Sequence, residues 1–163
     1  GVGINTGTAC VGNLGSEQRF DYSALGDSVN LASRLEGQSK TYGVDILLAE
    51  ETYAAANQLA AVELDLVQVV GKTEPVRIFA LIGDETVKDS TGFDRLIRLQ
   101  NDMLGAYRER QWDNALEIIR QLRNDAAAIS MTRYYDMFDE RVTEFRATPP
   151  DSDWDGVERR LVK

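Results

Sequence analysis

The spacing of apolar residues changes near the middle of the chain. Up to about residue 83, apolar residues fall in short runs broken by glycine and polar residues, a pattern that predicts strands with short connections. Beyond residue 92 they recur every three or four positions, which predicts amphipathic helices. The sequence therefore predicts an α+β fold in the first half, followed by an all-α tail.

The first half is predicted to hold one long helix among several strands. The helix runs from about Ser28 to Thr41, because Asp27 or Gly26 can cap its start and Gly43 falls where a left-handed cap would end it. A glycine-rich strand over residues 1–9 is predicted to be buried and to approach another backbone closely. Further elements are predicted as a hairpin turn at 11–16, strands at 19–23, 44–49, 62–66 (half-exposed) and 76–82, a short helix at 50–57 and a turn at 71–75.

The chain is predicted to divide into a first domain, a linker and a helical tail. Residues 1–83 are predicted to form the first domain, a polar stretch at 84–92 a linker, and residues 93–147 three helices. Pro149 and Pro150 end the last helix and begin an irregular tail over 148–163. The segment Ala106–Leu116 resembles part of one tetratricopeptide-like helical hairpin, although no repeat of it follows.

Composition limits the classes of partner and chemistry. The net charge of −9 argues against nucleic acid, whereas a small anionic substrate needs only a local basic pocket. The chain has no histidine, which excludes histidine acid–base catalysis and histidine metal sites. Its one cysteine, Cys10, cannot form an internal disulfide and is expected to be buried. No apolar run is long enough to span a membrane, so we expect a cytoplasmic protein, with any membrane tether upstream in a longer parent chain.

The segment Phe20–Glu36 carries the strongest chemical signal. A strand leads through a turn at Gly26 into the long helix, and Asn30 and Arg34 lie four positions apart on that helix. Residues at i and i+4 share one helix face, so an amide and a guanidinium project toward one point. A planar guanidinium suits a phosphoryl group undergoing substitution. Taken alone, Arg34 could also be a surface arginine paired with an acidic neighbour.

This segment resembles the class III nucleotidyl cyclases, which make cyclic AMP or cyclic GMP. Flanking motifs agree, namely Gly1–Gly7, Val11–Ser16 and Lys40–Ile46, so the resemblance runs from Gly1 to about Ile82. It implies part of a ferredoxin-like sandwich, a sheet with helices on one face, and a head-to-tail homodimer with active sites at the interface. The implied reaction converts ATP to cyclic AMP and pyrophosphate.

The resemblance also implies roles for single residues. Arg34 corresponds to the transition-state arginine that meets the α-phosphate, and Asn30 to the residue that orients the ribose. Ser23 corresponds to a purine-reading position and is typical of a bacterial Thr/Ser branch; its hydroxyl can serve adenine or guanine, so ATP is favoured and GTP stays open. Lys72 corresponds to a lysine on the terminal phosphates, and Arg19 is a weaker triphosphate candidate. Each of these last three also has an ordinary structural explanation, as a strand-end serine, a turn lysine and an ion-paired arginine.

Members of this family bind two Mg²⁺ or Mn²⁺ ions through aspartates that precede the glycine-rich strand, and they carry a purine-reading lysine there as well. This sequence contains neither ahead of its glycine-rich strand, which opens at Gly1, and its first acidic residue is Glu17. We therefore expect the metal ligands upstream, in a longer chain, and expect this chain alone to be inactive. Two alternatives remain, a non-catalytic cyclase-like regulatory module and a helical interaction protein whose working part is residues 93–147.

Overall fold

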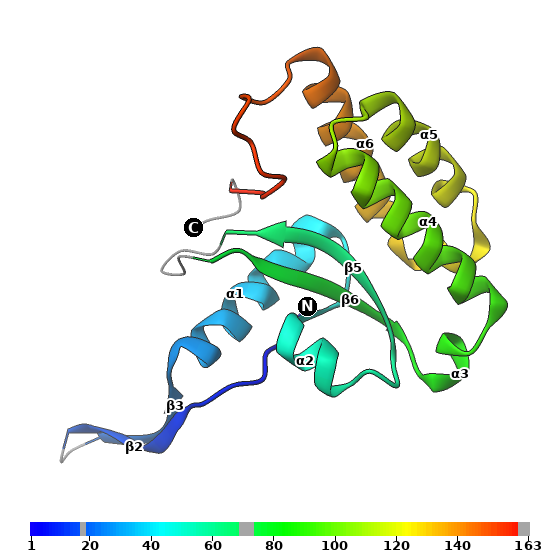
Figure 1. Ribbon diagram of the computed structural model, residues 1–163. Coiled ribbons are helices and arrows are strands. Elements are labelled where there is room, and N and C mark those ends of the chain that lie inside the picture. The colour runs from blue at the N-terminus through cyan, green and yellow to red at the C-terminus, as the bar shows by residue number, and fades with distance from the viewer. Residues whose placement is uncertain (17–18, 69–73, 160–163) are drawn as a thin grey trace.

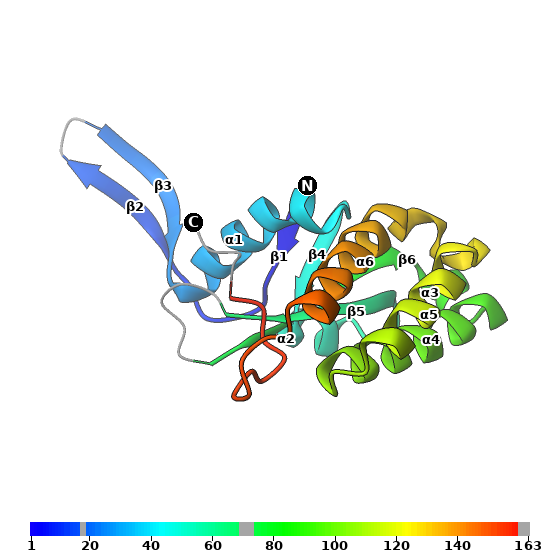
Figure 2. The same ribbon diagram turned by 90° about the horizontal axis from the view of Figure 1, so that it is seen from above.

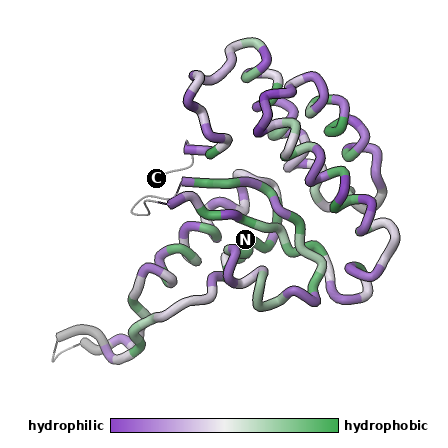
Figure 3. Tube along the Cα trace, in the orientation of Figure 1, coloured by the Kyte–Doolittle hydropathy of each residue, from purple (hydrophilic) through white to green (hydrophobic). Residues whose placement is uncertain are grey.

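A mixed four-stranded sheet forms the centre of the protein (Figure 1). The computed structural model describes residues 1–16, 19–68 and 74–159. The strands lie in the order β1-β4-β6-β5, with β1 parallel to β4 and the other pairs antiparallel. Their bounds are β1 Val2–Ile4, β4 Ile46–Ala49, β5 Ala60–Val67 and β6 Val76–Gly83. Hydrophobic residues are concentrated in these strands, whereas the tail helices mix both kinds (Figure 3). The predicted α+β class is confirmed.

Most helices pack on one face of this sheet. One hydrophobic cluster joins the strands to helix α1 and to the three helices of the tail, whose bounds are α1 Asp27–Tyr42, α4 Thr91–Arg108, α5 Trp112–Arg123 and α6 Thr132–Ala147. The short helix α2 (Glu50–Ala55) covers the opposite face instead, because Tyr53 stacks on Phe79 with ring centroids 4.0 Å apart. The prediction that the helices lie on one face of the sheet is therefore correct for α1 and the tail helices and wrong for α2.

Two further short helices connect these elements. Residues Glu85–Lys88 form α3, which Asp84 caps by accepting a hydrogen bond from the amide of Val87. A 3₁₀ helix over Ala126–Met131 joins α5 to α6. No helix within the described residues is both long enough and apolar enough to cross a membrane.

A two-stranded hairpin projects from the body of the protein (Figures 1 and 2). It consists of β2 (Cys10–Ser16) and β3 (Arg19–Leu25), paired antiparallel along their whole length. The prediction of a turn at 11–16 is wrong, because cross-strand pairing continues through both glycines to Ser16. The prediction that Cys10 is buried is also wrong.

The glycines of β1 let this strand lie directly against α1. A Cβ atom added at Gly3 would stand 2.2 Å from the carbonyl oxygen of Ala32 and 2.3 Å from the amide nitrogen of Glu36, both on α1. The predicted close approach of two backbones is therefore confirmed. The predicted burial is wrong, since Val2 and Ile4 remain 48% and 39% exposed at the sheet edge.

Replacing Gly3 with alanine is expected to destabilise the protein by about 1–3 kcal/mol, because the new methyl group meets backbone atoms that cannot rotate away. Gly37 provides the matched control, since it lies within α1 with nothing within 4 Å of an added Cβ. Gly37→Ala should instead stabilise by about 0.4–1 kcal/mol. Urea unfolding of both variants measures the difference, and equal effects would refute the close contact.

Candidate active site

A single glycine joins strand β3 to helix α1. Gly26 has φ 143° and ψ 162°, a conformation that favours glycine, and it is the N-cap of the helix. Its carbonyl oxygen accepts hydrogen bonds from the amides of Val29 (3.1 Å) and Asn30 (3.0 Å). The strand therefore turns at once into the helix, and Asn30 lies in the first helical turn. At the other end Gly43 adopts the predicted left-handed cap, with φ 66° and ψ 32°.

Asn30 and Arg34 are both exposed on α1. Leu31 and Leu35, each one position further along, are 4% and 2% exposed and face the sheet. This alternation fixes the rotation of the helix, so the amide and the guanidinium project together on the outer face. Asn30 lies in the first turn of the helix, near the end where the helix dipole is positive and favours an anion, and Arg34 lies one turn further along.

The remaining predicted site residues belong to the hairpin and to the segment between β5 and β6. Ser23 is partly buried on β3, opposite Gly12 of β2, on the strand that continues into α1. Arg19 is the first residue of β3, opposite Ser16. The side chain of Arg19 and all of Lys72 lie outside the described residues. Ser23, Asn30 and Arg34 thus belong to one continuous strand–turn–helix unit.

The described residues do not form a metal site. Within residues 1–16, 19–68 and 74–159, no three cysteine or acidic side chains gather so as to hold a metal ion. Asp27 is the first residue of α1 and lies exposed beside Gly26. The two Mg²⁺ or Mn²⁺ ions that the resemblance implies therefore do not fit the residues described.

The family of the chain follows from its first half. The sequence model of the family described as "Adenylate and Guanylate cyclase catalytic domain" matches residues 1–83, which include β1 to β6 and the whole strand–turn–helix unit. The chain belongs to this family. The predicted resemblance to class III cyclases is thereby confirmed, whereas the likeness of Ala106–Leu116 to a tetratricopeptide hairpin stays a prediction.

Several adenylate cyclases are similar to this cyclase-family chain. Adenylate cyclase 1 of Rhizobium meliloti is 38% identical over 82 residues, which are 50% of this chain and 12% of the relative. The terminal-differentiation-specific adenylate cyclase of Dictyostelium discoideum is 43% identical over 89 residues (52% and 4%). Adenylate cyclase of Anabaena cylindrica is 39% identical over 83 residues (48% and 16%). The chain thus spans a small part of the length of these relatives.

Among solved structures, the adenylyl cyclase CyaB from P. aeruginosa is 36% identical to this chain with a TM-score of 0.45, covering 50% of this chain and 41% of the other. A bacterial light-regulated adenylyl cyclase is 22% identical with a TM-score of 0.38, covering 56% and 44%.

Sequence reasoning missed three buried charges outside this site. Asp65, Arg141 and Glu158 have side chains that are 1%, 9% and 5% exposed, and Arg141 pairs with each of the two carboxylates. The alternating pattern of residues 62–66 predicted a half-exposed strand, and that prediction is wrong at Asp65. The pairing of Asp65 with Arg141 could not be predicted from local sequence, since the two residues are 76 positions apart.

Proposed function

We propose that this chain supplies one half of a nucleotidyl cyclase active site, and that the complete protein converts ATP to cyclic AMP and pyrophosphate. The observation that carries the proposal is the joint exposure of Asn30 and Arg34 on α1, directly after the Gly26 turn, inside the part of the chain that belongs to the cyclase family. A guanidinium fixed on a helix can stabilise charge that develops during phosphoryl transfer.

Each site residue has a distinct proposed task. Arg34 binds the α-phosphate as the 3′-oxygen of the ribose attacks it, and Asn30 hydrogen-bonds the ribose and aligns that oxygen. The hydroxyl of Ser23 can donate to or accept from the purine edge. Arg19 and Lys72 are candidates for holding the triphosphate, which needs cations along its length.

The proposed substrate is ATP. Three similar proteins are named adenylate cyclases, which favours adenine over guanine. Ser23 does not decide between them, since a hydroxyl can pair with either base, and GTP remains the alternative substrate. A direct comparison of cyclic AMP and cyclic GMP formation distinguishes the two.

We propose that the catalytic metal ions are bound by carboxylates that are not among the described residues of this chain. Mg²⁺ or Mn²⁺ would hold the triphosphate and activate the attacking hydroxyl, yet the described residues offer no carboxylate cluster to bind them. This chain by itself is therefore proposed to be inactive. Residues 1–83 are proposed as the cyclase part, 84–92 as the linker, 93–147 as the helical tail and 148–163 as the C-terminal segment.

The projecting hairpin supports a homodimer. Val11, Tyr22 and Leu25 are 55%, 77% and 55% exposed on β2 and β3. A two-stranded hairpin is marginally stable alone, and exposed apolar side chains on it favour burial against a partner. A second copy of the same protein would cover this surface and complete an interface active site with its own metal carboxylates.

Mixing two inactive variants tests this arrangement. One variant of the complete protein carries Arg34→Ala, and the other lacks its metal-binding carboxylates. If the active site spans two protomers, an equal mixture should recover about one quarter of wild-type activity, because half the dimers are mixed and each holds one intact site. Each variant alone should stay inactive. A mixture that also stays inactive, although it exchanges subunits, would contradict the shared site.

A further inference from the structure

Strand β5 contains a bulge that turns a carboxylate into the interior. Glu63 pairs with Phe79 and Asp65 pairs with Ile78, so Leu64 is an extra residue in the ladder. Leu64 and Asp65, although adjacent, are both buried, at 0% and 1% exposed. A bulge re-aims a side chain in this way. It places Asp65 on the face covered by α1 and the tail.

The tail binds the backbone of this bulge. The hydroxyl of Tyr134 on α6 donates to the carbonyl oxygen of Leu64 (2.7 Å), and the side-chain amide of Gln100 on α4 donates to that of Glu63 (2.7 Å). Carbonyl groups at the bulge thus accept hydrogen bonds from side chains of the tail helices. The contact between tail and sheet is therefore specific as well as apolar.

Asp65 is the centre of a buried network that joins helices α1 and α6 to strand β5 and to the segment that holds Glu158. Its Oδ2 accepts hydrogen bonds from the hydroxyl of Tyr42 (2.8 Å) and from Nη1 of Arg141 (2.6 Å), and its Oδ1 accepts from the amide of Leu66 (2.9 Å). Nε of Arg141 lies 3.4 Å from Oε2 of Glu158. Burial raises the pKa of Asp65, while the guanidinium of Arg141 opposes that rise.

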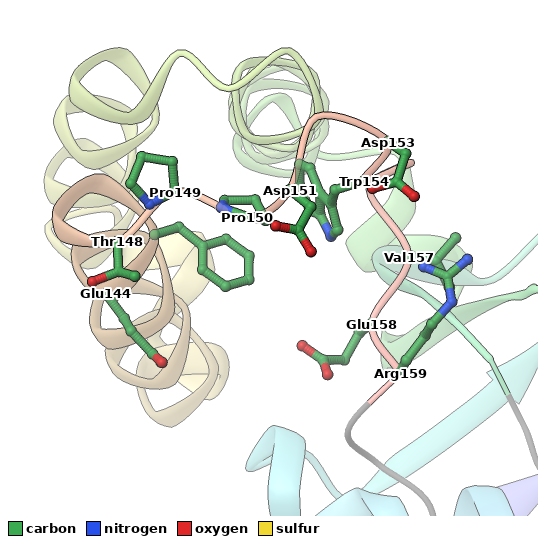
Figure 4. A pocket seen from close by; sticks show the side chains of 11 residues that line it. Glu144, Thr148, Pro149, Pro150, Asp151, Asp153, Trp154, Val157, Glu158 and Arg159 are labelled. Atoms are coloured by element: carbon green, nitrogen blue, oxygen red, sulfur yellow. The ribbon is translucent and has the colours of Figure 1, made fainter.

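Glu158 belongs to a segment that returns along the edge of β5. Its amide donates to the carbonyl oxygen of Leu66 (2.8 Å), and its carbonyl oxygen accepts from the amide of Gln68 (3.0 Å). Figure 4 shows Glu158 extending from this segment toward α6, beside a cavity of about 570 Å³, while Arg159 points away. The returning segment pairs with the C-terminal end of the β5 edge and presents Glu158 to Arg141.

Tyr42 is the last residue of α1, the helix that carries Asn30 and Arg34. At 1.5 Å per residue, Arg34 lies about 12 Å and Asn30 about 18 Å from this anchored end. Because a helix behaves as a rod over this length, its orientation depends on how its C-terminal end is held. A shift of about 1 Å at reacting groups can cost about 10²-fold in rate.

We propose, building on the proposed function, that Arg141 and Glu158 are positioning residues that act through Asp65 and Tyr42 to fix α1, and so place Asn30 and Arg34. The network sets the position of the helix end by directional hydrogen bonds, which apolar packing alone does not supply. Through Arg141 on α6, the helical tail thereby helps to position the helix that carries Asn30 and Arg34.

Tyr42→Phe tests this proposal, because it removes only the hydroxyl that ties α1 to Asp65. Tyr135→Phe is the matched control, since Tyr135 is an equally buried tyrosine whose hydroxyl donates within the tail, to Gln100 at 3.0 Å. In the complete protein, well below the melting temperature, Tyr42→Phe should lower kcat about tenfold with KM for ATP unchanged. Tyr135→Phe should leave both near wild type. Glu158→Gln should lower kcat about threefold, through Arg141.

Hydrogen–deuterium exchange on the present chain measures the anchoring of α1 independently of catalytic turnover. Amides of residues 31–42 should exchange faster in Tyr42→Phe than in Tyr135→Phe, because α1 has lost its anchor. Equal kcat values together with equal exchange in the two variants would overturn the proposal. A wild-type protein that forms no cyclic nucleotide would instead refute the proposed function, and the exchange comparison would still decide whether the network anchors α1.

Discussion

Replacing Arg34 with alanine is expected to slow cyclic AMP formation by about 10²–10³-fold in a protein that contains the complete catalytic domain. The guanidinium is proposed to stabilise charge that develops on the α-phosphate, and alanine offers no donor there. Stability should change by no more than about 0.5 kcal/mol, since Arg34 is exposed. Initial rates and melting temperatures of the same preparations measure the two quantities.

Two further variants sharpen this result. Arg98→Ala makes the same chemical change at an exposed position of α4 and should leave the rate unaltered. Arg34→Lys keeps the charge but loses the planar pair of donors, so it should recover only part of the activity. If Arg34→Ala retains wild-type turnover, Arg34 does not act on the phosphate and the assignment of the site is wrong.

Replacing Arg141 with alanine is expected to destabilise the protein by about 3–5 kcal/mol, because it removes the guanidinium that pairs with the buried carboxylates of Asp65 and Glu158. Arg146 on the same helix provides the control. Its partner Asp113 is 88% exposed, so Arg146→Ala should cost about 0–1 kcal/mol. Urea unfolding at pH 7 compares the two, and a small loss in Arg141→Ala would show that the network contributes little to stability.

The stability difference between Arg141→Ala and wild type should become smaller as the pH falls. Burial already raises the pKa of Asp65 with Arg141 beside it, and removal of the guanidinium should raise it further. The folded variant then holds a proton on Asp65 at pH values where the unfolded chain has lost it. By linkage, its stability increases as the pH is lowered from 7 toward the ordinary aspartate pKa of about 4. A difference from wild type that is constant over this range would contradict the assignment.

Local signals explain what could be predicted from the sequence. The long helix was predicted within one residue at each end, because Gly26 and Gly43 mark its termini through the backbone conformations that they adopt. The shared face of Asn30 and Arg34 follows from their spacing alone. The recurrence of apolar residues every three or four positions beyond residue 92 likewise predicted a helix, and Phe93, Leu96 and Tyr107 are buried in α4.

Features that depend on distant segments could not be predicted. The turn expected at 11–16 is a strand, because pairing with β3 outweighs the local preference of Gly12 and Gly15. In the sequence, Asp65 occupies a polar position of an alternating strand, which predicts exposure. Its burial follows from the bulge at Leu64 and from its hydrogen bond with Arg141, which is distant in sequence. Cys10 is exposed because the hairpin projects from the body of the protein, and the spacing of apolar residues along the chain does not predict this projection.

The most direct test of the central claim is the product formed from ATP by the complete protein in the presence of Mg²⁺ or Mn²⁺. We predict cyclic AMP and pyrophosphate in equal amounts, with GTP converted more slowly to cyclic GMP. Failure to form a cyclic nucleotide from either substrate, in a preparation that is folded and binds metal, would contradict the assignment of this chain to a working cyclase.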